Sequence, residues 1–167
     1  GFTGGVGIAE EWTGNCEDAE HWRDTHVRVE GPVVRDLLSG FVDNWAEATG
    51  CILSGRQHLP DVGGFDDGIQ AQVTRSTAQK GSTDAEQLFY TAIACARERI
   101  WLTTAYFAPR QAFVDALCEA VGRGVDVRVL TNGPHTDKEV VRQAGRRCYE
   151  QLLACGGRIF EYQRTML

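Results

Sequence analysis

The sequence contains no run of about 18 apolar residues, so no segment of it is predicted to span a lipid bilayer. Basic residues are in deficit, because 17 Lys and Arg face 23 Asp and Glu, which gives a net charge of −6. Nucleic-acid binding draws most of its affinity from basic groups on phosphates, so we expect no nucleic-acid partner. The 43% hydrophobic and 24% charged residues exclude a disordered tail and indicate a globular domain.

Several patterns that mark catalytic or metal sites are also missing. The sequence has no H-E-x-x-H, no EF-hand loop, no paired-carboxylate spacing and no readable Ser-His-Asp set. None of the six cysteines forms a C-x-x-C pair, and none clusters with histidine at zinc-site spacing. We therefore expect no metal site, and we interpret the cysteines as reduced thiols that pack as small hydrophobic side chains.

The two ends of the chain carry no processing signals. The sequence begins at Gly1 without an initiator methionine or a signal peptide, and it ends on Arg164-Thr165-Met166-Leu167. From these ends we expect an interior piece of a longer protein. We expect that protein to be cytoplasmic, or membrane-associated on the cytoplasmic side.

Apolar residues recur at helical spacing in four stretches, with strand-like stretches between them. The predicted helices cover residues 32–48, 84–97, 109–121 and 137–155. The predicted strands cover residues 22–29, 69–76, 100–104, 125–130 and 158–162. This alternation indicates an α/β layered fold, in which chemistry collects in the loops at the carboxyl edges of strands.

Two groups of residues near the start of the chain are candidates for a site. The glycines of Gly1–Gly7 can cradle a phosphate, but their spacing matches neither G-x-G-x-x-G nor a Walker A sequence. A tight exit from a strand beside an active site is the alternative. Asp24 and His26 are two residues apart on the predicted strand 22–29, so they point to the same side. They are either a carboxylate that orients a catalytic imidazole or a structural polar pair.

Two further groups lie at the predicted carboxyl edge of the sheet. Tyr106 and Phe107 follow the predicted strand 100–104, where they form either the wall of a pocket or part of the core. Asn132 and His135 lie in the next loop. Asn132 can donate to an anion and His135 can act as a catalytic or ligand residue, but exposed loop residues of these types often do neither.

Six segments taken together resemble one family, the phospholipase D superfamily, and within it the cardiolipin-synthase-like branch. They follow one another in order over nearly the whole chain, at residues 1–9, 21–32, 44–50, 96–109, 123–130 and 156–167. One of them contains Thr-Ala-Tyr-Phe-Ala-Pro at 104–109. The resemblance implies two α/β lobes that meet at a shared cleft, each with a layered mixed sheet and flanking helices.

The active site of that family is built from two H-x-K-x-x-x-x-D motifs, one from each lobe. One His attacks phosphorus and forms a phosphohistidine, the other protonates the leaving alcohol and then activates the acceptor, and no metal or cofactor is needed. Neither motif occurs here, because none of His21, His26, His58 and His135 is followed two residues later by Lys. A second departure is Gly7, where the family often has Asn.

The resemblance therefore places this chain between the two motifs. The first would end shortly before Gly1, and the second would begin directly after Leu167. Residues 1–50 then form the remainder of the first lobe, residues 51–68 form a connector, and residues 69–167 form the front part of the second lobe. The expected architecture is an incomplete two-lobe structure.

Within that span the resemblance implies roles for five residues. Gly4 and Gly5 match the glycine pair that follows the first motif, where they would contact substrate. Asp24 matches the acidic residue that orients the histidine of the first lobe, as the carboxylate of a catalytic triad does. Tyr106 and Phe107 match the pocket-lining segment T-x-Y-F-x-P of the family.

The implied function is a phosphatidyltransferase or phosphodiesterase that acts on phospholipids, such as one that joins phosphatidylglycerol units into cardiolipin. We expect the isolated chain to be inactive, and we expect the whole protein to make peripheral membrane contact and to form a homo-oligomer. Three alternatives remain open. They are a superfamily phosphodiesterase or nuclease with a non-lipid substrate, a non-catalytic assembly module, and a nucleotide-binding domain that uses the glycines of residues 1–7.

Overall fold

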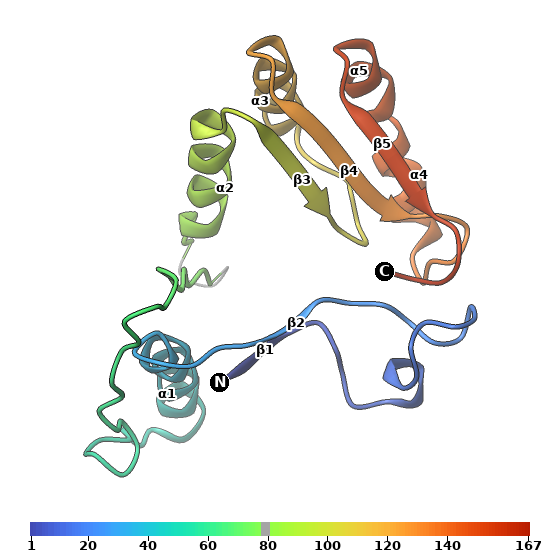
Figure 1. The fold of residues 1–167 in the computed structure, drawn as a ribbon. Coiled ribbons are helices and arrows are strands. Elements are labelled where there is room, and N and C mark those ends of the chain that lie inside the picture. Colours follow the sequence, from blue (N-terminus) through green and yellow to red (C-terminus); the bar gives the residue numbers. More distant parts are fainter. Residues whose placement is uncertain (78–80) are drawn as a thin grey trace. The chain divides into compact units, whose positions relative to one another are not determined.

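The computed structural model describes residues 1–77 and 81–167. Residues 78–80, which fall in the expected second lobe, lie outside the described residues. The chain forms two compact units. Unit 1 comprises Gly1–Gly4 and His26–Ala85, and unit 2 comprises Gly5–Thr25 and Glu86–Leu167. Together they contain helices and two sheets, so the predicted α/β class is confirmed (Figure 1).

Unit 1 combines a short antiparallel ribbon with one long helix. Strand β1 (Phe2–Gly4) pairs with β2 (His26–Arg28), and helix α1 (Val34–Thr49) confirms the helix predicted over residues 32–48. The helix ends at Gly50, which adopts the left-handed conformation that glycine tolerates best, with a φ of 70°. Its amide donates to the carbonyl of Ala46 at 2.8 Å.

Two predicted strands differ from the structure in this part of the chain. The strand predicted over 22–29 is limited to β2, because β1 offers only three residues for pairing. The strand predicted over 69–76 is absent, since no neighbouring strand supplies hydrogen bonds to it within the described residues. This stretch instead contacts α1, where Arg75 forms an ion pair with Asp43.

Unit 2 is built on a three-stranded parallel sheet. Its strands are β3 (Arg99–Thr103), β4 (Asp126–Asn132) and β5 (Arg158–Tyr162), in that order. Parallel neighbours need crossover connections, which are helix α3 (Gln111–Gly122) for the first pair and helices α4 (Glu139–Arg146) and α5 (Tyr149–Ala154) for the second. Helix α2 (Asp84–Cys95) precedes β3, and a 3₁₀ turn, η1 (Glu10–Trp12), lies in the segment 5–25.

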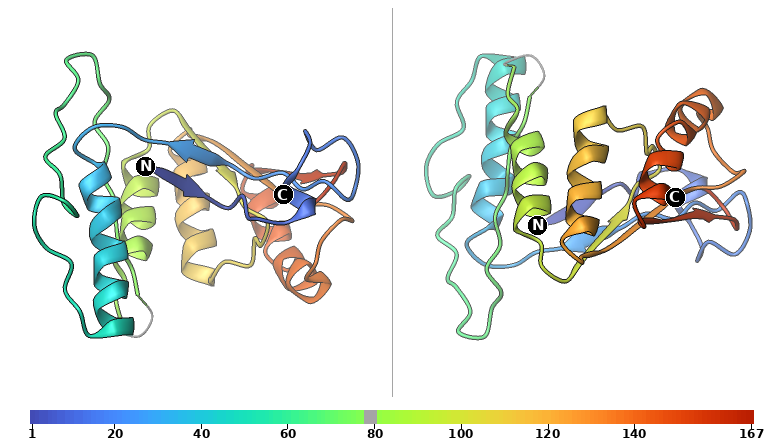
Figure 2. Two further views of the ribbon diagram at one scale, coloured as in Figure 1. Left: turned by 90° about the horizontal axis from the view of Figure 1, so that it is seen from below. Right: turned by 90° about the horizontal axis from the view of Figure 1, so that it is seen from above.

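The core of unit 2 lies between one face of the sheet and the helices. Alternate residues of β3 and β4, such as Ile100, Val127 and Val129, pack with Val114 and Leu117 of α3. Helices α3 and α5 lie side by side over this face (Figures 1 and 2).

The opposite face of the sheet carries exposed side chains. Trp101 of β3 is 59% exposed, and the guanidinium groups of Arg99 and Arg128 lie 5.0 and 5.1 Å from the centre of its ring. Asp126 bonds to Arg128 and Arg158, and these hydrogen bonds hold the pKa of the Asp126 carboxyl well below its usual range. Phe160 of β5 is also half-exposed.

Two features of the last crossover differ from prediction. The helix predicted over 137–155 is divided into α4 and α5. The backbone N–H groups of Arg147 and Cys148 donate to carbonyls three positions earlier, as in a 3₁₀ turn, and this interrupts the α-helix. Cys118 and Cys155 form a disulfide that joins α3 to the end of α5, with Cα atoms 5.7 Å apart. The prediction of reduced thiols is therefore wrong for this pair.

None of the helices in the described ranges has the length and apolar character that crossing a membrane requires.

Candidate functional site

The loops that follow the three strands of unit 2 meet at one edge of the sheet. Thr103 at the end of β3 pairs with Leu130, and Asn132 at the end of β4 pairs with Tyr162 at the end of β5. Because all three strands run the same way, their carboxyl ends face one edge. The sequence placed Tyr106, Phe107 and the loop 131–136 at this edge, and the structure has them there.

Tyr106 is fixed at this edge by a hydrogen bond. Its phenolic oxygen donates to Oδ1 of Asp137 at 2.6 Å, and its side chain is 43% exposed. The hydrogen bond to Asp137, followed by partial burial and the charge of that carboxylate, raises the pKa of Tyr106 to about 12. Tyr106 is therefore a neutral hydroxyl at physiological pH, and its oxygen retains lone pairs that can accept a hydrogen bond from a ligand.

Phe107 points into the core, where it is 6% exposed. Its backbone is held by α4, because a Cβ on Gly145 would lie only 2.1 Å from the carbonyl oxygen of Phe107. Glycine at position 145 thus allows the helix to reach the loop. Phe107 contributes both to the core and to the wall of a cavity described below, so a core position and a pocket-wall position are compatible for this residue.

Asn132 is buried and has hydrogen-bond partners at both ends of its amide. Its Oδ1 accepts from the backbone N–H of Leu167 at 2.8 Å, and its Nδ2 donates to Oγ1 of Thr136 at 3.4 Å. The neighbouring Gly133 approaches β5 closely, since a Cβ there would lie 2.2 Å from the carbonyl oxygen of Tyr162. Asn132 therefore joins the end of β4 to the segment 165–167, and its contact with an anion stays a prediction.

The segment 165–167 also joins residues 19–23 of the same unit. The backbone N–H of Arg23 donates to the carbonyl of Met166 at 2.9 Å, and the hydroxyl of Thr165 donates to the carbonyl of Ala19 at 3.2 Å. Thr165 is completely buried. Sequence reasoning missed this role of Thr165, because no spacing rule connects residues that lie 146 positions apart.

His135 is partly exposed, and its imidazole makes no hydrogen bond or ion pair with the residues that the structure describes. A ligand role for it stays a prediction. Across the described ranges 1–77 and 81–167, no three His, Cys, Asp or Glu side chains come together in a way that would hold a metal ion.

Gly5 and Asp24 face each other within unit 2. The amide of Gly5 donates to the carbonyl of Thr25 at 3.4 Å, which brings the two short stretches side by side. The carboxylate of Asp24 lies against the Cα of Gly5 and accepts from the N–H of Thr25. Asp24 precedes β2, so strand alternation does not relate it to His26. Gly4, in unit 1, pairs with His26 in the ribbon and has a φ of 146°.

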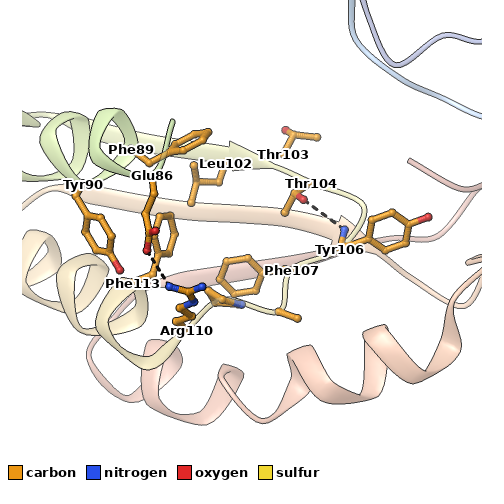
Figure 3. A pocket seen from close by; sticks show the side chains of 12 residues that line it. Glu86, Phe89, Tyr90, Leu102, Thr103, Thr104, Tyr106, Phe107, Arg110 and Phe113 are labelled. Carbon is orange, nitrogen blue, oxygen red and sulfur yellow. Dashed lines mark hydrogen bonds and ion pairs between the residues drawn. The ribbon is translucent and has the colours of Figure 1, made fainter. Parts of the chain in front are cut away.

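A cavity of about 530 Å³ lies between α2, β3 and α3, beside the loop of Tyr106 (Figure 3). Most of its wall is apolar and aromatic, from Phe89, Tyr90, Leu102, Phe107 and Phe113. The rings of Tyr90 and Phe113 meet edge to face, with centres 5.8 Å apart. At the rim the guanidinium of Arg110 reaches the carboxylate of Glu86 at 3.5 Å.

Known proteins with similar sequences include several cardiolipin synthases. Residues 89–167 match a family described as cardiolipin synthase, PLD-like domain. The whole chain is 36% identical to the cardiolipin synthase of Halalkalibacterium halodurans and to cardiolipin synthase A of Pseudomonas putida GB-1, and 32% identical to the cardiolipin synthase of a Geobacillus species. It covers 33–34% of these relatives, so it spans about a third of the length of the curated relatives it matches. No solved structure matches it significantly.

Proposed function

We propose, from the premise that this chain belongs to the cardiolipin-synthase-like branch of the phospholipase D superfamily, that it forms part of a phosphatidyl-transfer site. The whole protein would act on phospholipids and join two phosphatidylglycerol molecules into cardiolipin. The chain would supply pocket walls and positioning groups. Both reacting histidines would come from H-x-K motifs that these 167 residues do not contain.

The observation that carries the proposal is the hydrogen bond between Asn132 and Leu167. The buried amide at the end of β4 holds the backbone of residue 167 at 2.8 Å. If the second motif follows Leu167, as the resemblance implies, this bond supports a position for its histidine near the carboxyl edge of the sheet. That edge is where chemistry collects in open α/β sheets.

In this proposal the residues of the chain act on the reaction in different ways. Asp24 would orient the histidine of the first motif and stabilise its imidazolium form through the carboxylate charge. Tyr106 would contact the substrate through its hydroxyl, while Gly4 and Gly5 would let the backbone approach it closely. One histidine would attack phosphorus and form a phosphohistidine, while the other histidine gives a proton to the leaving alcohol. The acceptor alcohol would then attack the phosphohistidine and give its proton back to the second histidine.

We further propose that the whole protein reaches its substrate as a peripheral membrane protein on the cytoplasmic side, and that it self-associates. The exposed Trp101 and Phe160 on the open face of the sheet support self-association, because such apolar side chains are commonly covered in assemblies. The 167 residues alone are expected to show no turnover, since they have neither a nucleophile nor a general acid of the required type.

The test is transfer by the full-length protein in vesicles that contain phosphatidylglycerol. Cardiolipin and free glycerol should appear in equal amounts, and an acid-labile phosphatidyl group should be trapped on histidine during turnover. A full-length protein that forms neither product, and that releases no phosphatidic acid either, would overturn the proposal. Release of nucleotides from DNA or RNA in place of these products would favour the nuclease alternative.

A further inference from the structure

The cavity between α2, β3 and α3 has a mostly apolar wall, and five of its twelve lining residues are aromatic. Phe89 and Tyr90 enter it from α2, Leu102 from β3, and Phe113 from α3 (Figure 3). Its volume of about 530 Å³ falls within the range of pockets that bind small molecules. Since most of the surrounding side chains are apolar, the cavity favours a hydrocarbon group over a polar one.

The rim of the cavity adds one cation to this apolar wall. Arg110 lies between the cavity and solvent, with its side chain 84% exposed. Its partner Glu86 lies 3.5 Å away and is 41% exposed, and an exposed pair of this kind is worth only about 0–1 kcal/mol. A phosphate can therefore compete with Glu86 for the guanidinium, which binds phosphate oxygens through paired N–H donors.

We propose that this cavity binds a hydrocarbon chain of an anionic phospholipid, with Arg110 holding the phosphate at the polar end of the molecule. The inference rests on the proposed function and identifies where the lipid chain lies relative to the carboxyl edge of the sheet. The cavity is continuous with that edge, because Thr104 and Tyr106 also line it. One amphiphilic ligand thus satisfies both the aromatic wall and the rim cation.

Binding can be measured without turnover by calorimetry on the chain, with hexyl, octyl and decyl phosphate below their micelle-forming concentrations. Each buried methylene should strengthen binding about fourfold until the cavity is filled, after which the gain should stop. Inorganic phosphate, which lacks the chain, should bind at least a hundredfold more weakly than decyl phosphate. Affinities that do not change with chain length would overturn the proposal.

Variants of wall and rim residues test the apolar contribution of the wall and the charge contribution of the rim separately. Phe89→Ser, which removes a half-exposed wall residue, should weaken octyl phosphate and the neutral octyl glucoside alike by about tenfold. The matched control is Leu88→Ser, because Leu88 is the preceding residue of α2, is similarly exposed and does not line the cavity. Arg110→Gln should weaken only octyl phosphate, and Glu86→Gln should strengthen it.

Two other results would contradict the proposed occupant of the cavity. If Phe89→Ser abolishes a dimer seen by sedimentation and leaves alkyl binding unchanged, the cavity receives a side chain from a second copy, and the proposal fails. If Arg110→Gln and Glu86→Gln leave octyl phosphate binding unchanged, the rim does not recognise the anion, and the proposal also fails. Because no step of the assay needs a histidine, a failure here is distinct from a failure of phosphatidyl transfer.

Discussion

The carboxylate of Asp24 occupies the space that a side chain at position 5 would need, since its Oδ2 lies 1.8 Å from where a Cβ on Gly5 would be. Glycine at this position therefore determines where the carboxylate can lie. The family resemblance gives these two residues separate roles, Gly5 as a substrate contact and Asp24 as an orienting acid. Their contact makes them one unit that mutations should disturb together.

In the full-length protein, Asp24→Asn should lower the turnover number by a factor on the order of 10³–10⁴, because an amide cannot stabilise the imidazolium form. Gly5→Ala should lower it less, by displacing the carboxylate. Gly63→Ala is the control, because a Cβ at position 63 has no atom within 4 Å. Cardiolipin formation and thermal melting measure the two effects, and unchanged turnover in Asp24→Asn removes this residue from the mechanism.

Asn132→Ala should reduce the free energy of unfolding by about 1–3 kcal/mol, because the buried N–H of Leu167 loses its acceptor. Asn44→Ala on the exposed surface of α1 should change it by less than about 0.5 kcal/mol. Urea denaturation followed by circular dichroism gives both values. Equal stability of the two variants would show that the Asn132 amide contributes nothing to holding residues 165–167.

Gly145→Ala should destabilise the chain by about 1–3 kcal/mol, because the new methyl group would meet the carbonyl oxygen of Phe107 and force the loop away from α4. Gly122→Ala makes the same change at the end of α3 with no atom within 4 Å, so it should be neutral or stabilising by up to about 1 kcal/mol. Urea midpoints compare the two. A stable Gly145→Ala protein would indicate that α4 does not anchor the loop.

Tyr106 should ionise at a pH of about 12, roughly two units above an unperturbed tyrosine. The raised pKa means that the folded state favours the neutral phenol, so this stabilisation is complete below about pH 10 and is lost as the pH rises through 12. Absorbance at the tyrosinate band should show a late ionisation, and Tyr106→Phe should reduce it by one tyrosine, because burial also raises the pKa of Tyr149. Asp137→Asn should move it toward 10, and an unmoved titration would mean that the Asp137 carboxylate does not control the pKa.

The local periodicity of the sequence was sufficient to predict most helices and strands of unit 2. The spacing of apolar residues predicted α2 and α3, and the short apolar runs predicted β3, β4 and β5, since each element buries one face against its neighbours. Residues 69–76 alternate in a strand-like pattern, yet they form no strand, because no partner strand lies beside them among the residues that the structure describes. Strand formation depends on that partner, which a local pattern does not reveal.

The candidate site was predictable only in part for the same reason. Tyr106 and Asn132 could be placed at the carboxyl edge because strand direction fixes where each loop emerges. The hydrogen-bond partners of these residues could not be predicted, since Asp137 lies 31 positions from Tyr106 and Leu167 lies 35 positions from Asn132. The disulfide between Cys118 and Cys155 likewise depends on how α3 and α5 pack, which spacing alone does not determine.

The hydrogen bonds that join residues 19–23 to residues 165–167 also have a consequence for biosynthesis. A ribosome that adds roughly 5–20 residues per second completes Leu167 about seven to thirty seconds after Thr25. During that interval the segment 5–25 lacks its hydrogen-bond partners at residues 165–167, while the helices and strands of residues 86–162 can form from contacts among themselves. The nascent chain therefore assembles unit 2 from its later part first, and the early segment docks only after residues 165–167 have been made.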